Sequence, residues 1–121
     1  MNTMQAFWDD CGQGSPSDAA VQVHQTQAQD LWSDLRGIEG NFLGLIDAEG
    51  RTIQFCFTDG IPDDVEDARH LSIVLLDFPV PDRGGSFSRQ ATVGEVHALI
   101  AQAFGTGADP AAFAGLEFSA W

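Results

Sequence analysis

Two β-rich runs on either side of a turn sequence constrain the fold of this chain more than any other feature. In the run Thr52–Phe57 a large apolar side chain occupies every second position. A period of two is typical of a strand with one buried face. The preceding run, Phe42–Ile46, is joined to it by Asp-Ala-Glu-Gly at residues 47–50, which suits a type I turn followed by a left-handed glycine. The sequence therefore predicts a β-hairpin over residues 42–57.

A first helix is expected over about residues 26–36. Thr26 and Gln29 have the spacing of a capping box, in which each side chain bonds to the backbone N–H of the other residue. Gly37 is a natural stop after the last turn. Apolar residues behind the cap follow the spacing of one buried helix face: Ala28, Leu31, Trp32 and Leu35.

A second helix is expected over about residues 93–104. Thr92 and Glu95 form another capping-box pattern, and Gly105 and Gly107 follow the last apolar position. The buried face of this helix is predicted to consist of Val93, Val96, Ile100, Ala103 and Phe104.

Between these elements the sequence predicts strands and irregular segments. Residues 20–23 alternate well enough for a short strand, and residues 71–78 are apolar on both faces, as in a central strand. Pro79 and Pro81 are expected to end that strand. The Gly-Gly-Ser-Phe-Ser segment that follows, residues 84–88, is expected to be irregular.

Both ends of the chain are expected to pack on the body. Residues 1–19 have the composition of a turn-rich leader in which Phe7 and Trp8 dock on the domain. Asp109 and Pro110 can open a short turn, and the apolar tail 116–121 can pack back on the sheet. The whole chain, residues 1–121, is therefore predicted to be one α+β domain, with an antiparallel sheet of about four to five strands and two main helices on one face.

Charge limits the class of partner. The sequence has 18 Asp and Glu residues against five Arg and no Lys, which gives a formal net charge of −13. Such a field repels nucleic acid and anionic membranes and attracts basic proteins. The alternative interpretation is that the charge only keeps a small protein soluble.

The cytoplasm is the expected compartment. The beginning of the sequence lacks the basic and apolar regions of a secretory signal, and the longest apolar run, residues 71–76, is far too short to span a membrane. Cys11 and Cys56 are too few for a disulfide scaffold, so free thiols are expected, although one bridge between them stays open.

Patterns that carry chemistry are scarce. The histidines and cysteines lie far apart in sequence, so no metal site and no cofactor is predicted. The glycine-rich segment 84–88 lies between Arg83 and Arg89 but lacks the lysine of a phosphate-binding loop. His97 lies on or beside an apolar helix face and His70 at the expected start of a strand, so either is more simply a structural residue than a catalytic base.

The densest acidic segment follows the hairpin. Five acids fall within nine residues: Asp59, Asp63, Asp64, Glu66 and Asp67. Three interpretations stay open at this point, namely a solvated loop, a calcium loop whose usual spacing is missing, and a docking patch for a basic protein. Because the loop directly follows a well-defined strand, a rigid element would present it, which suits binding.

The residues also carry a resemblance. The stretch Val-Gln-Val-His-Gln-Thr-Gln-Ala-Gln-Asp-Leu-Trp-Ser-Asp-Leu (residues 21–35), the hairpin 42–57, the late helix running into Gly-Thr-Gly-Ala-Asp-Pro (residues 105–110) and the final Trp121 are similar to small acidic bacterial immunity proteins of polymorphic toxin systems. The nearest group is the one paired with deaminase-type toxins. The resemblance covers about residues 20–121.

The resemblance implies an immunity protein, not an enzyme, that binds a cognate toxin stoichiometrically and blocks its active site or its substrate entry. A toxin that acts on nucleic acid is basic where its substrate binds, so an acidic inhibitor is complementary to it. The predicted partner-binding residues are the five acids of the 59–67 segment. The alternative is a small hydrolase or isomerase in which His97 or His70 works with a carboxylate.

Overall fold

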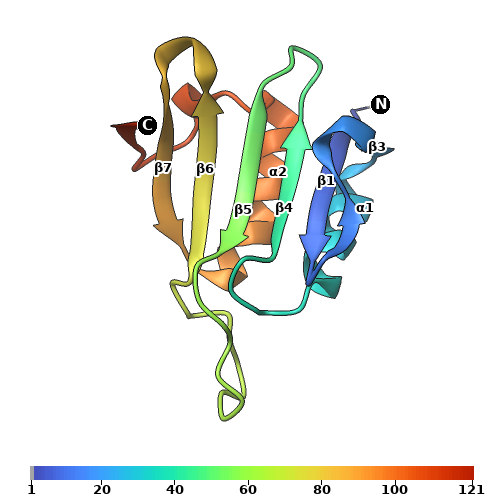
Figure 1. The fold of residues 1–121 in the computed structure, drawn as a ribbon, viewed down its shortest axis with the longest axis vertical. Coiled ribbons are helices and arrows are strands. Elements are labelled where there is room, and N and C mark those ends of the chain that lie inside the picture. The colour runs from blue at the N-terminus through green and yellow to red at the C-terminus, as the bar shows by residue number, and fades with distance from the viewer. Residues whose placement is uncertain (1) are drawn as a thin grey trace.

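A computed structural model describes residues 2–121 of the chain, which form one α+β domain with a single antiparallel sheet and two α-helices (Figure 1). The strands follow the order β2-β1-β4-β5-β6-β7-β8, and β3 also pairs with β1. Their bounds are β1 Met4–Asp10, β2 Gln13–Ser15, β3 Val21–Val23, β4 Phe42–Ile46, β5 Thr52–Phe57, β6 Val74–Val80, β7 Gly85–Ala91 and β8 Glu117–Ala120. The helices are α1 Gln25–Asp34 and α2 Val96–Thr106, and four 3₁₀ turns cover residues 17–19, 81–83, 93–95 and 110–112.

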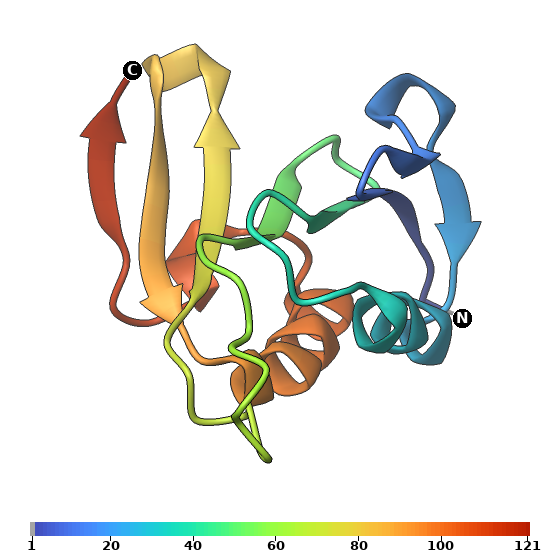
Figure 2. The same cartoon turned by 60° about the horizontal axis from the view of Figure 1, so that its bottom comes forward.

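Both helices lie side by side on one face of the sheet (Figure 2). The alternation of β5 produces this layering, because Ile53, Phe55 and Phe57 are buried while the residues between them are half-exposed on the other face. Trp32 of α1 stacks on Phe57 with ring centroids 4.7 Å apart and an interplanar angle of 8°. Burying one such side chain contributes about 1.5–3 kcal/mol. The α+β class, the antiparallel sheet and the two helices are thus confirmed.

The hairpin predicted over residues 42–57 is confirmed, with the same strand bounds. Gly50 has φ of +80°, the left-handed value that the turn requires. Asp47, at the first turn position, has a buried side chain that accepts hydrogen bonds from the N–H groups of Glu49, Arg51 and Ala108, the last at 2.8 Å. The guanidinium of Arg51 donates a further hydrogen bond to the Asp47 carboxylate, also at 2.8 Å. One carboxylate therefore closes the turn and joins it to the chain after α2.

The two helices are in place, but one of the two caps differs from the prediction. Helix α1 begins at Gln25, and the side chain of Gln27 accepts a hydrogen bond from the N–H of His24 at 2.8 Å, so the capping box predicted at Thr26 is wrong. Because β3 ends at the buried Val23, the chain must turn into the helix immediately afterwards. The capping box of Thr92 with Glu95 is confirmed, with hydrogen bonds in both directions.

The sheet has eight strands, so the prediction of four to five was wrong, and much of the difference lies at the N-terminus. Residues 4–10, interpreted as part of a leader, form β1 between β4 on one side and β2 and β3 on the other. Phe7 is buried and Trp8 is half-buried, as members of a strand instead of docked leader residues. Met1, the first residue of that predicted leader, lies outside the described residues.

The remaining strands lie at the other edge. The segment predicted to be irregular at 84–88 belongs to β7, which pairs with β6 over its full length. Pro79 lies inside β6 and does not end it; pairing with β5 stops at Asp77, so the missing N–H of this proline is tolerated. The tail forms β8 at the edge of the sheet, and Trp121 is 73% exposed instead of packed on a face.

Cys11 and Cys56 are both free thiols, as the sequence predicts. Among residues 2–121, no helix has the length and apolar character that crossing a membrane requires.

The structure predicts that Asp47→Asn lowers the free energy of unfolding by about 2 kcal/mol at pH 7, because it removes a charged acceptor from buried hydrogen bonds. Burial alone raises the pKa of Asp47, but the hydrogen bonds from Arg51, Ala108 and Glu49 hold it below the usual value near 3.8. Because the pKa of Asp47 is lower in the folded protein than in the unfolded chain, its ionised carboxylate stabilises the fold at pH values above the unfolded-state pKa. This stabilisation is lost as the pH falls through the pKa of the folded state. Urea unfolding should therefore show the difference between wild type and variant shrinking below about pH 4. A difference that is constant down to pH 2 would contradict this role.

Candidate functional site

The five acids singled out in the sequence lie together in the loop between β5 and β6, residues 58–73. This loop extends beyond the end of the sheet that lies opposite the β4–β5 and β6–β7 turns, and is the long green-to-yellow segment in Figure 1. All five side chains, Asp59, Asp63, Asp64, Glu66 and Asp67, are exposed. The structure therefore presents them as a group at one end of the molecule.

The carboxylates of this loop differ in their contacts. Asp67 accepts hydrogen bonds from the guanidinium of Arg69 at 2.8, 3.0 and 3.2 Å and from the Arg69 N–H at 3.0 Å, and these contacts hold the pKa of Asp67 well below its usual value. Asp59 accepts a local hydrogen bond from the N–H of Gly60. No hydrogen bond or ion pair to another described residue satisfies the carboxylates of Asp63, Asp64 or Glu66, so these three charges are open to a partner.

Backbone hydrogen bonds fix the base of the loop. The N–H of Ile61 donates to the carbonyl of Gly37 at 2.8 Å, directly after α1. The closing end of the loop is tied to the 3₁₀ turn that precedes α2, as Figure 2 shows. Two bonds make this connection, from Val93 N–H to Leu71 carbonyl at 3.0 Å and from Gly94 N–H to Arg69 carbonyl at 2.9 Å. The base of the loop is thus held by the segment after α1 and by the turn before α2.

A hollow of about 350 Å³ opens beside this base, where α1, α2 and the loop meet. Ile61 and Arg69 of the loop line it on one side. Most of its lining is apolar, and the apolar side chains in it include Trp32, Leu35, Phe57 and Val93. The sequence did not reveal this hollow, because its lining comes from four segments that are far apart in the chain.

His97 also lines this hollow, but its partner is a hydroxyl. Its Nε2 lies 2.9 Å from Oγ of Ser33 on α1. A hydroxyl beside an imidazole is one component of a nucleophilic catalytic site. Such a site also needs a group that orients the imidazole, and N–H donors that stabilise an oxyanion. Within residues 2–121 no carboxylate hydrogen-bonds the His97 ring, and the N–H groups of Val93 and Gly94 already have backbone partners. His70 is exposed in the loop, outside the strand that it was predicted to open.

The face of the sheet opposite the helices is a second surface. Half-exposed side chains from β4, β5 and β6 lie there, including Phe42, Ile46, Cys56, Leu75 and Asp77. Burial and the neighbouring charge of Asp77 raise the pKa of the Cys56 thiol to about 11, so this thiol is protonated and unreactive at neutral pH. Burial likewise raises the pKa of Asp77, against the effect of the Ser86 hydroxyl.

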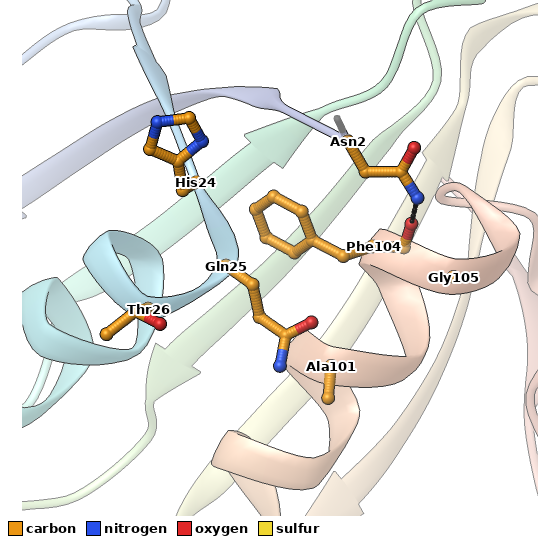
Figure 3. A pocket seen from close by; sticks show the side chains of 7 residues that line it. All are labelled: Asn2, His24, Gln25, Thr26, Ala101, Phe104 and Gly105. Carbon is orange, nitrogen blue, oxygen red and sulfur yellow. Dashed lines mark hydrogen bonds between the residues drawn. The ribbon is translucent and has the colours of Figure 1, made fainter.

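A second hollow, of about 380 Å³, lies between the start of β1 and the facing ends of the two helices (Figure 3). Phe104 occupies its centre, and the amide of Asn2 donates to the Phe104 carbonyl at 2.8 Å. His24, Gln25 and Thr26 surround it without converging on a common point.

Among residues 2–121, no group of three or more His, Cys, Asp or Glu residues is arranged to hold a metal ion.

The arginines are engaged within the molecule, so they leave the acidic surfaces uncompensated. Arg83 lies over the rings of Phe87 and Phe118, with its guanidinium carbon 5.1 and 4.6 Å from the ring centroids. The other four form ion pairs with acids of the same chain: Arg36 with Asp10, Arg51 with Asp47, Glu49 and Asp109, Arg69 with Asp67, and Arg89 with Glu95.

Comparison with protein-family models, with curated proteins and with solved structures finds no match to this chain.

The base of the loop yields a prediction. A side-chain Cβ at Gly37 would collide with the side chain of Ile61, and the backbone there is not left-handed, so Gly37→Ala should disturb only this contact. We expect faster amide hydrogen exchange across residues 58–66, with little change in the sheet. Gly105→Ala is the matched control, because a Cβ there meets open space. Equal exchange in the two variants would show that Gly37 does not hold the loop.

Proposed function

We propose that this protein binds and neutralises a bacterial toxin that has a basic surface, through stoichiometric protein–protein contact and without catalysing a reaction. The observation that carries the proposal is the loop 58–73, which presents exposed carboxylates without internal partners on a base fixed by backbone hydrogen bonds. A group of like charges on a fixed base favours a partner of opposite charge, because less of the backbone has to be ordered on binding.

The distribution of arginine supports the same proposal. Four of the five arginines are paired with acids of the chain, and the arginine of the loop, Arg69, pairs with Asp67, so the charges of Asp63, Asp64 and Glu66 are not offset by an ion pair. An enzyme that acts on nucleic acid carries Lys and Arg where its substrate binds. An acidic domain that covers that surface competes directly with the substrate, and its long-range field accelerates association.

The site around His97 gives less support to a small hydrolase or isomerase. The histidine faces the Ser33 hydroxyl, and the carboxylate expected to work with it is not among its hydrogen-bond partners within residues 2–121. The apolar lining around the pair is better suited to contact with another protein than to acid–base chemistry.

Neutralising the three open carboxylates tests the proposal. We expect the triple variant Asp63→Asn, Asp64→Asn, Glu66→Gln to associate roughly tenfold more slowly with the toxin encoded beside this protein, at low salt, because electrostatic steering accounts for factors of this size. The salt dependence of the association rate should also become shallower. Stopped-flow fluorescence or surface plasmon resonance over a range of salt concentrations provides the measurement.

A matched control changes the same charge elsewhere. Asp18, Asp30 and Asp82 are exposed, form no hydrogen bond or ion pair with any described residue, and lie on three other parts of the surface. Replacing all three with Asn should lower the rate less than the loop variant does. If both triple variants behave alike, only the total charge matters and the loop is not the contact. If the wild-type protein does not inhibit the toxin at a one-to-one ratio, the proposed function is wrong.

A further inference from the structure

We propose that the hollow between α1, α2 and the base of the loop receives one large apolar side chain from a basic segment of the partner. This inference rests on the proposed function, because it adds to the acidic loop a second contact that fixes the partner in place. The hollow lies at the foot of the loop, and Ile61 and Arg69, on the two sides of the acidic tip, both line it.

The floor and walls of the hollow are rigid and apolar. Trp32 and Phe57 stack on one another and are each 4% exposed, so they form a packed aromatic floor of which only a small part of each ring is accessible. Leu35 and the half-buried Ile61 and Val93 complete the lining. A volume of about 350 Å³ is small for a ligand pocket but sufficient for a single aromatic or branched aliphatic side chain.

Small residues keep the hollow open. Ser33 lies at its edge on α1, and its hydroxyl is held against Nε2 of His97 at 2.9 Å, so it does not fill the space. Gly94 is required for another reason, because a Cβ there would lie 2.9 Å from the Arg69 side chain and push the loop away. The hollow is thus produced by the same contacts that hold the loop.

Charge around the hollow indicates the kind of segment that carries the apolar side chain. Asp67 already pairs with Arg69, while Asp63, Asp64 and Glu66 are open. The loop that continues from the lining residue Ile61 therefore carries uncompensated negative charge, which complements Lys or Arg near the inserted side chain. An acidic or uncharged segment would lack this complementarity.

The two contacts have separable effects. Exposed charges act mainly on the association rate, whereas a side chain buried in a well-packed pocket acts mainly on the dissociation rate. Filling the hollow should therefore weaken binding without changing its salt dependence, which is the reverse of what neutralising the loop does.

Short peptides of known sequence test the inference on the intact protein. The probes are acetyl-Arg-Trp-Arg-amide and acetyl-Arg-Ala-Arg-amide, which have the same charge and differ in one apolar side chain. Nuclear magnetic resonance titration of the ¹⁵N-labelled protein gives both the affinity and the location of binding. We expect the tryptophan peptide to bind about tenfold more tightly, from the burial of one aromatic side chain. Its largest shifts should occur at Ser33, Val93, Gly94 and His97.

Ser33→Trp fills the hollow from within and should remove the advantage of the tryptophan peptide; Ser33→Leu, a smaller change on the same helix, should reduce it in part. Thr26→Trp is the matched control, since Thr26 is exposed on α1 but lines a different hollow. Equal affinity of the two peptides for the wild type, or an unchanged preference in Ser33→Leu with an intact spectrum, would overturn the inference. Neither result would affect the toxin experiment with the loop variants, so the two proposals fail independently.

Discussion

The stack of Trp32 on Phe57 fixes the part of the molecule on which the proposed function depends. It locks α1 onto β5 at the last residue of that strand, where the chain leaves the sheet and enters the acidic loop. Because α1 ends two residues later, Gly37 comes to lie under Ile61 and accepts its hydrogen bond. This contact between a helix and a strand thus helps to position the base of the loop and one wall of the hollow.

A net charge of −13 would ordinarily work against a compact domain, since like charges repel. The structure limits this cost by keeping most acids at the surface and by pairing several of them with arginines of the same chain. Asp47 is the clearest case, with Arg51 and three backbone N–H groups around one buried carboxylate. The arginines thus stabilise the fold, and the remaining carboxylates are free to produce the external field.

Local patterns in the sequence were sufficient for the hairpin 42–57, for the second capping box and for the identity of the acidic loop. Each of these depends on residues within a few positions of one another. The strand β1 was missed because Asp9 and Asp10 lead into a turn-rich segment, and only its pairing with β4 makes it a strand. Likewise, Gly85 weakens the strand propensity of β7, yet a Cβ there would meet the β8 backbone, so this glycine permits the pairing. The hollow depends on contacts such as Ser33 with His97, 64 positions apart, which no local pattern encodes.

The most direct test of the account is a hydrogen-exchange footprint of the protein alone and in complex with the toxin proposed as its partner. The account predicts slower exchange across residues 58–69 and 93–97, the loop and the edge of the hollow, with little change in β4 and β5. Protection confined to the sheet strands, with the loop exchanging at its free rate, would contradict it.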